Sequence, residues 1–274
     1  MIDVKSLDEL LEMIEKQDTM IFGTGYVAER FIDGLEKRGL GDRISCFVTT
    51  KGQDQEYKRR PVISTDKLSS YNNESFICIA AHESILGEIK DLLKERGVNN
   101  SIWIYPYLHE LWFGKPVGTF EVEVSKIIEK WKDYRLAIRA LVIDQYYGKN
   151  DLGYDIYVKT QSFHCEENTA KKRLNSFIRL IESWDKQGFD NTSRPKVSKD
   201  YEVLDGAHRI TLARYHQMKT ISCDVYEIEN GKSFRNDEVD ITDGILRKST
   251  LSPEEIDMII STQCKYSIPD EGRK

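Results

Sequence analysis

The chain has 274 residues, of which 39% are hydrophobic, and it carries a formal net charge of −6. That length is sufficient for two ordinary domains with separate cores. The acidic balance argues against a protein that neutralises the phosphates of DNA or RNA, because such binding needs clustered lysine and arginine. No apolar run reaches the roughly 20 residues that cross a membrane, and the cysteines form no CxxC pair. We therefore expect a soluble, cytoplasmic protein that binds neither nucleic acid nor membrane.

The first half of the sequence alternates strand-like and helix-like segments. After an amphipathic helix at the N-terminus, a short apolar strand at Thr19–Phe22 leads into Gly23-Thr24-Gly25 and a helical pattern that continues to about Arg38. Three more runs of strand length and a further helix follow: Arg43–Val48, Ser75–Ala80, Ser101–Tyr105 and the helix Glu83–Arg96. Lys51–Arg60 is polar and is predicted to be a loop. The alternation predicts a parallel sheet covered by helices, a Rossmann-like domain at residues 1–115.

The second half follows a different pattern. The stretch from Phe120 to Gln145 has apolar residues at helical spacing, which predicts one long helix in a linking segment at 116–148. The domain boundary is expected at Tyr105–Gly118, and residues 149–274 are expected to form an α+β domain. Its predicted strands are Tyr154–Val158, Tyr201–Leu204 and Ile221–Glu227, and its predicted helices are Thr169–Gln187, Gly206–His216 and one beginning at the cap Ser252.

Gly23, Gly25 and Tyr26 belong to a segment, GTGYVA, that fits the dinucleotide fingerprint GxGxxG/A. Such glycines let N–H groups at a helix N-terminus approach a pyrophosphate. The fingerprint also needs an acidic residue near the end of the second strand, where this sequence has Cys46-Phe47-Val48-Thr49-Thr50. Residues 19–106, with GTGYVAERF and RPVISTDKL, resemble the Rossmann-like N-terminal domains of bacterial glycan-modifying enzymes. This half is expected either to bind a nucleotide or sugar nucleotide or to have a structural or partner-binding role.

A second turn, in the segment VLDGAHRITLAR, places Asp205, Gly206, Ala207, His208 and Arg209 between a strand and a helix. Gly206 permits a tight turn, the free N–H groups of the first helical turn face outward, and His208 and Arg209 add donors. We expect this turn to bind the phosphates of a nucleotide. In a purely structural alternative, Arg209 pairs with a surface carboxylate, His208 caps a helix and Asp205 satisfies turn amides.

Residues from about 150 to 228 resemble the ParB/sulfiredoxin superfamily, through RLNSFIRLIESWDKQGF, RPKVSKDYEVLDGAHRITLARYHQ and TISCDVYEI. Ala207 occupies the position of the sulfiredoxin cysteine nucleophile, and residues 230–274 are too few and too acidic for the DNA-reading domain of chromosome-partitioning ParB proteins. The free-serine-kinase branch is the most similar, because it has an Asp-Gly-x-His-Arg turn and an upstream His/Glu-Glu segment. Here the upstream segment is His164-Cys165-Glu166-Glu167, followed by Arg173-Leu174.

This resemblance implies a kinase that phosphorylates a hydroxyl of an amino acid, polyol or sugar, for example a surface-glycan precursor. The cofactors would be ATP or ADP, with CTP as an alternative, and Mg²⁺. The residues implied to hold the nucleotide phosphates are Gly206, Ala207, His208 and Arg209, with Lys196 as a further candidate. A carboxylate would take the proton of the acceptor hydroxyl, and the candidates, in order, are Glu167, Glu166 and Asp205. Asp205 is also the candidate Mg²⁺ ligand.

Three alternatives remain open at this stage. The two glutamates can be ordinary acids of a first helical turn, which interact favourably with the helix dipole. The protein can be a ParB-like switch that binds or hydrolyses a nucleotide without a small-molecule acceptor. It can also be an NAD(P)-dependent oxidoreductase that uses the Gly23–Ala28 turn. The sequence sets no oligomeric state, and a homo-oligomer is compatible with it.

Overall fold

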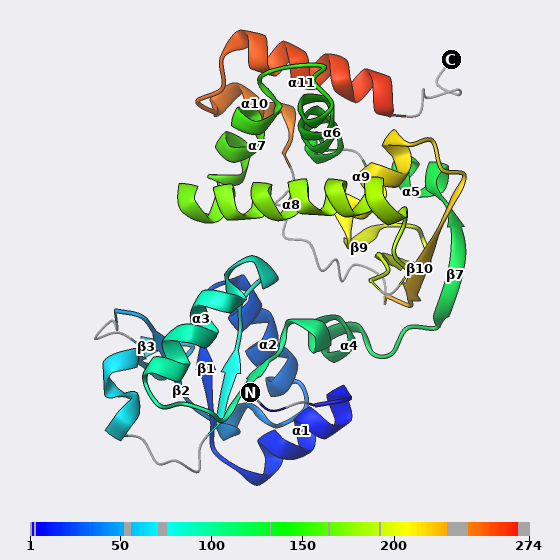
Figure 1. Cartoon of the computed structure of the whole chain (residues 1–274). Coiled ribbons are helices and arrows are strands. Elements are labelled where there is room, and N and C mark those ends of the chain that lie inside the picture. Colours follow the sequence, from blue (N-terminus) through cyan, green and yellow to red (C-terminus); the bar gives the residue numbers. More distant parts are fainter. Residues whose placement is uncertain are drawn as a thin grey trace. The chain divides into compact units, whose positions relative to one another are not determined.

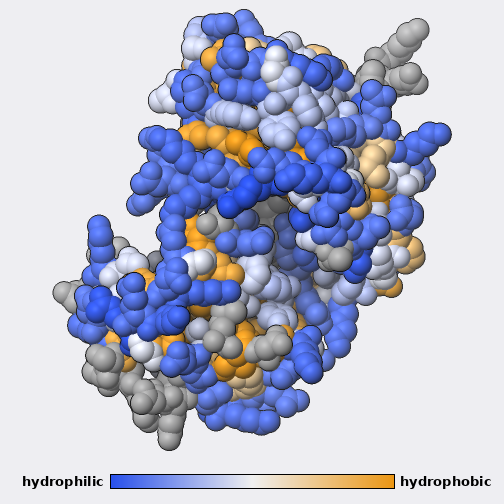
Figure 2. All heavy atoms as spheres, viewed as in Figure 1, coloured by the Kyte–Doolittle hydropathy of each residue, from blue (hydrophilic) through white to orange (hydrophobic). Residues whose placement is uncertain are grey.

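The computed structural model describes residue 2 and residues 4–51, 56–70, 76–131, 133–163, 165–191, 193–228 and 241–267. They form a mixed α/β fold with two sheets (Figure 1). The chain divides into two compact units, Met1–Gly114 (unit 1) and Lys115–Lys274 (unit 2), and this division lies inside the stretch Tyr105–Gly118. Figure 2 shows that hydrophilic side chains cover most of the visible face, with apolar side chains in patches between them. In the described part of the chain, no helix is long and apolar enough to cross a membrane.

Unit 1 contains a six-stranded sheet in the order β3-β4-β2-β1-β5-β6. Its strands are β1 (Thr19–Phe22), β2 (Ile44–Thr49), β3 (Glu56–Tyr57), β4 (Arg60–Ser64), β5 (Phe76–Ile79) and β6 (Ser101–Trp103). Its helices are α1 (Leu7–Lys16), α2 (Tyr26–Glu36), α3 (Glu83–Glu95) and α4 (Leu108–Phe113), with short 3-10 turns η1 (Gly41–Arg43), η2 (Thr65–Ser70) and η3 (Tyr105–Tyr107). The strands pair in parallel except for the β3–β4 hairpin. Strands β1 and β5 are buried along their whole length, as is usual for central strands of a parallel sheet.

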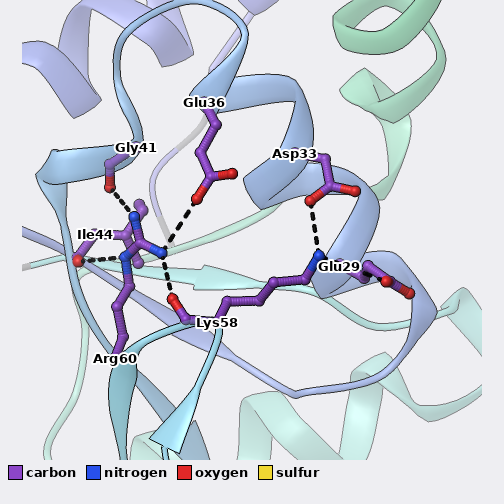
Figure 3. A network of polar contacts seen from close by, with 7 residues as sticks. All are labelled: Glu29, Asp33, Glu36, Gly41, Ile44, Lys58 and Arg60. Carbon is purple, nitrogen blue, oxygen red and sulfur yellow. Dashed lines mark hydrogen bonds and ion pairs between the residues drawn. The ribbon is translucent and has the colours of Figure 1, made fainter.

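A polar network fixes the β3–β4 hairpin to α2 and to the start of β2 (Figure 3). Arg60 donates to three carbonyls and one carboxylate: Ile44 O (3.1 Å), Gly41 O (2.9 Å), Lys58 O (2.8 Å) and Glu36 Oε1 (3.3 Å). The ammonium of Lys58 meets two carboxylates of α2, those of Asp33 (3.0 Å) and Glu29 (3.6 Å). Lys58 and Arg59 have φ of 50° and 62°, which is typical of a two-residue hairpin turn. The loop prediction was therefore wrong for Glu56–Arg60, and residues 52–55 lie outside the described part.

Unit 2 contains a four-stranded sheet in the order β7-β10-β8-β9. Its strands are β7 (Gly118–Glu123), β8 (Lys196–Ser198), β9 (Val203–Asp205) and β10 (Thr220–Tyr226). Its helices are α5 (Val124–Lys130), α6 (Arg135–Tyr146), α7 (Gly153–Gln161), α8 (Glu167–Gln187), α9 (Ala207–Tyr215), α10 (Asp243–Lys248) and α11 (Pro253–Tyr266). Strand β10 is antiparallel to β7 and parallel to β8, and β8 is antiparallel to β9.

The core of unit 2 consists of two apolar clusters. One joins α6, α7, α8, α10 and α11, and the other joins the sheet to α5 and α9. Trp184 of α8 packs against both clusters, and α9 contributes Leu212 to the first and Ile210 to the second. Helices α8 and α9 therefore each contact both apolar clusters. This packing holds the turn that precedes α9 in place.

Two sequence-based predictions for unit 2 were wrong. Tyr154–Val158 lies in α7, not in a strand, and the adjacent side chains of Ile156 and Tyr157 are both buried. A strand on a sheet surface would turn them to opposite faces, whereas a helix enclosed by α6 and α8 can bury both. The long helix at Phe120–Gln145 is instead strand β7 followed by α5 and α6, because Phe120–Glu123 pairs with β10. The segment 116–148 is thus not a linking helix.

Candidate functional site

The β9–α9 turn has the backbone that its sequence predicts. Gly206 has φ +83° and ψ 21°, in the left-handed region that favours glycine. A Cβ at this position would also lie 2.7 Å from Cα of Pro195, so two separate reasons require glycine. Helix α9 begins at Ala207 without a side-chain cap from any described residue. The N-cap residue Gly206 thus offers no side-chain acceptor to the first N–H groups of α9.

Asp205 and Lys196 lie side by side on the strand side of this turn. They face each other in the β8–β9 register, and Lys196 Nζ lies 3.3 Å from Asp205 Oδ2. The other carboxylate oxygen, Oδ1, accepts a hydrogen bond of 2.7 Å from the N–H of Gly206. The two side chains are 22% and 32% exposed. The structure therefore places a carboxylate and an ammonium side by side immediately before α9.

His208 points into unit 2. Its ring lies 4.4 Å from the ring of Phe177 in α8, and its Nε2 lies 2.9 Å from the hydroxyl of Tyr157 in α7. One ring nitrogen is thus already engaged inside the protein. His208 therefore helps to fix α9 against α7 and α8, and its role as an anion donor stays a prediction.

Arg209 is the half-buried cation of the turn. It lines a small cavity of about 40 Å³ together with Leu180, Ser183, Trp184, Gly188, Phe189 and Asp190. Within the part of the chain that the structure describes, the guanidinium makes no hydrogen bond or ion pair. A guanidinium carries five donors in a fixed fork that suits phosphate. Arg209 is therefore available to an anionic ligand at the start of α9.

Glu166 and Glu167 lie away from this turn. Glu166 is the N-cap residue of α8, and Glu167 is an exposed first-turn acid paired with Lys171 at 2.5 Å. The hydrogen bond from Lys171 lowers the pKa of Glu167. At about 1.5 Å per residue, Leu180 beside Arg209 lies about 20 Å along the axis of α8 from Glu167. His164 lies outside the described residues.

Sequence reasoning missed Tyr157 and Gln161, because α7, to which they belong, was not predicted as a helix. Tyr157 and Gln161 lie one helical turn apart, as do Arg173 and Phe177, and Arg173 donates to Oε1 of Gln161 at 3.1 Å. Burial raises the pKa of Tyr157, while the charges of Arg139 and Arg173 act in the opposite direction. Positive charge therefore also surrounds the inner side of the turn.

The Gly-rich turn of unit 1 joins β1 to α2 as predicted. Gly23 has φ +109°, and a Cβ there would lie 3.0 Å from the carbonyl oxygen of Ala80. Gly25 is the N-cap of α2, and Tyr26 is its first residue, 36% exposed, with the guanidinium of Arg30 5.2 Å from its ring. Strand β2 ends at Thr49, and the described residues that follow it directly, Thr50 and Lys51, are not acidic. The turn therefore has the predicted glycine backbone, and no acidic residue stands at the described end of β2.

Among the described residues, no group of three or more histidine, cysteine, aspartate or glutamate side chains could hold a metal ion. A magnesium ion would find Asp205 as one protein ligand at the turn, with nucleotide phosphates as the others. No protein-family model matches the chain, and neither a curated protein nor a solved structure matches it.

Proposed function

We propose that the turn Asp205–Arg209 binds the phosphates of a nucleotide and that unit 2 transfers a phosphoryl group to a hydroxyl of a small molecule. The observation that carries this proposal is Arg209, a half-buried residue in the first turn of α9 whose guanidinium makes no hydrogen bond or ion pair with the described residues. A helix N-terminus and an arginine fork both favour phosphate oxygens. The expected ligand is ATP or ADP, with CTP as an alternative.

In this proposal Asp205 is the carboxylate that acts on the acceptor. The acceptor oxygen attacks the terminal phosphorus, the bond from phosphorus to the bridging oxygen breaks, and the acceptor proton passes to Asp205. The nucleotide leaves with one phosphate fewer. Lys196, whose Nζ lies 3.3 Å from Asp205 Oδ2, neutralises phosphate charge nearby. Magnesium, when bound with the nucleotide, supplies further neutralisation of phosphate charge.

The geometry favours Asp205 over the two glutamates that the sequence put first. Asp205 immediately precedes Gly206, whereas Glu167 is exposed, paired with Lys171 and about 20 Å along α8 from the residues beside Arg209. A base must lie within hydrogen-bonding reach of the proton that it takes. Asp205 meets this requirement for a substrate held at the turn.

The experiment is transfer of label from ATP or ADP labelled in its terminal phosphate, with pools of amino acids, polyols and sugars as acceptors. We expect acceptor-dependent transfer by the wild type, at least about 100-fold less by Asp205→Asn, in the range of a lost general base, and an unchanged rate for the control Glu167→Gln. Loss of transfer in Glu167→Gln with retention in Asp205→Asn would overturn the assignment of Asp205.

The separation of Glu167 from the turn also favours a second candidate, a nucleotide-binding switch without an acceptor. The switch predicts that nucleotide binds with the same affinity when acceptors are absent and that no acceptor receives label. Nucleotide binding without any transfer across the acceptor pools would therefore replace the kinase by the switch. Binding of NAD at the Gly23–Ala28 turn would instead support the oxidoreductase alternative.

A further inference from the structure

Strand β7 borders a groove of about 340 Å³ in unit 2. The residues that line this groove are Val117, Phe120, Glu121, Val122, Glu123, Lys126, Lys199, Tyr201 and Val225. Phe120 and Val117 are 51% and 46% exposed, more than any other large hydrophobic side chain in the described part of the chain. Exposed apolar side chains that gather beside a groove mark a binding surface. This surface is separate from the turn at Gly206, because β7 and β9 form opposite edges of the sheet, about 14 Å apart at the usual strand spacing.

The backbone of β7 has an open edge. The strand pairs with β10 on one side, and no described strand pairs with its other side. The N–H of Val124 bonds to the carbonyl of Lys219, so even-numbered residues of β7 bond to β10 in this antiparallel ladder. Thr119, Glu121 and Glu123 therefore direct their N–H and C=O groups away from β10. These groups can receive an added strand.

The side chains on the two faces of β7 differ in character. Phe120 and Val122 face the groove, with Val225 of β10 on the same face. Glu121 and Glu123 alternate with them. Glu121 is exposed and makes no ion pair with another described residue, whereas Glu123 is paired with Lys126 at 2.9 Å. A strand alongside β7 would thus meet apolar side chains on one face and carboxylates on the other.

We propose that the open edge of β7 binds an extended peptide in which apolar and basic residues alternate. The peptide's backbone continues the sheet, its apolar side chains pack on Phe120 and into the groove, and a lysine or arginine side chain pairs with Glu121. A second copy of this chain fits the edge poorly, because β7 paired with itself about Glu121 would put two carboxylates directly opposite each other.

The test is fluorescence anisotropy of a labelled eight-residue peptide that alternates lysine and isoleucine, titrated with the full chain. Glu121→Lys reverses the charge that a basic peptide would meet, and Phe120→Ser removes the apolar contact. Glu121→Pro removes an outward N–H and leaves the bonds to β10 intact. The control Glu95→Lys reverses an exposed charge in unit 1.

We expect saturable binding by the wild type and Glu95→Lys, and at least about tenfold weaker binding by the three β7 variants. An equivalent peptide of glutamate and isoleucine should not bind. Equal binding by wild type and all three β7 variants, or equal binding of the acidic peptide, would overturn the proposal. Sedimentation should show that β7 mediates no self-association, and a dimer lost in Glu121→Pro would assign the edge to a second copy instead.

Discussion

Replacing Gly206 with alanine should destabilise unit 2 more than an ordinary glycine substitution. Residue 206 has φ +83°, and left-handed backbone costs an L-residue about 1–2 kcal/mol. The new Cβ would also lie 2.7 Å from Cα and 2.9 Å from Cβ of Pro195. These are a backbone and a ring atom, which cannot simply rotate away, and such crowding costs about 1–3 kcal/mol. The expected loss in free energy of unfolding is therefore about 2–5 kcal/mol.

Urea denaturation followed by circular dichroism measures this loss, and Gly148→Ala is the matched control. Gly148 belongs to the same unit and has φ +71°, but an added Cβ there would meet nothing within 4 Å. The control should therefore lose only the backbone contribution of about 1–2 kcal/mol. Gly206→Ala should also weaken nucleotide binding, because relief of the overlap displaces the N–H groups that begin α9. Equal losses for the two variants would refute the argument that Pro195 restricts this turn.

Three further predictions concern side-chain contacts that stabilise the two units. Glu255→Gln should cost about 1–2 kcal/mol at pH 7, because this buried carboxylate accepts from Lys159 and completes the cap of α11. Burial alone would raise the pKa of Glu255, but its hydrogen bonds lower it. This stabilisation is present above about pH 4.3, the pKa of an unfolded glutamate, and it is lost as pH falls through the folded-state pKa of Glu255. The free energies of unfolding of the wild type and Glu255→Gln, plotted against pH, should therefore converge in acid and stay apart in alkali. Arg60→Ala should lower the free energy of unfolding of unit 1 by about 1–3 kcal/mol. Arg60→Lys should lose stability as well, because an ammonium lacks the planar fork that serves four acceptors. A lysine variant as stable in urea as the wild type would contradict this. Tyr157→Phe should cost about 1–2 kcal/mol by leaving Nε2 of His208 without that partner, and an unchanged urea midpoint would contradict the importance of this hydrogen bond.

Local sequence signals predicted the turns well. Gly206 and the apolar segments around it define a strand, a tight turn and a helix within one short stretch, and the capping residues Ser252 and Glu255 form the predicted capping box of α11. The alternating strands and helices of unit 1 likewise follow from short-range patterns. Each of these features depends on residues that are close in sequence.

The errors arose where distant contacts decide the structure. Phe120–Glu123 becomes a strand because it pairs with Thr220–Cys223, about a hundred residues later, and no local pattern shows that partner. Tyr154–Val158 contains tyrosine, isoleucine and valine, which are common in strands, but it packs as a helix against α6 and α8. Without α7, the hydrogen bond between Tyr157 and His208 could not be foreseen. The sequence put Glu167 first as the base, whereas the function that we propose assigns this role to Asp205.

Nucleotide binding by calorimetry, with ATP, ADP, CTP and NAD each tested in the presence of Mg²⁺, examines the central claim most directly. The proteins are the wild type, Arg209→Ala and the control Arg179→Ala, which removes an exposed arginine of α8. We predict micromolar binding of one nucleoside phosphate by the wild type and by Arg179→Ala, and about 10- to 100-fold weaker binding by Arg209→Ala, the loss of a charge-assisted contact. Absence of nucleotide binding, or equal binding by Arg209→Ala and Arg179→Ala, would contradict a phosphate site at Asp205–Arg209.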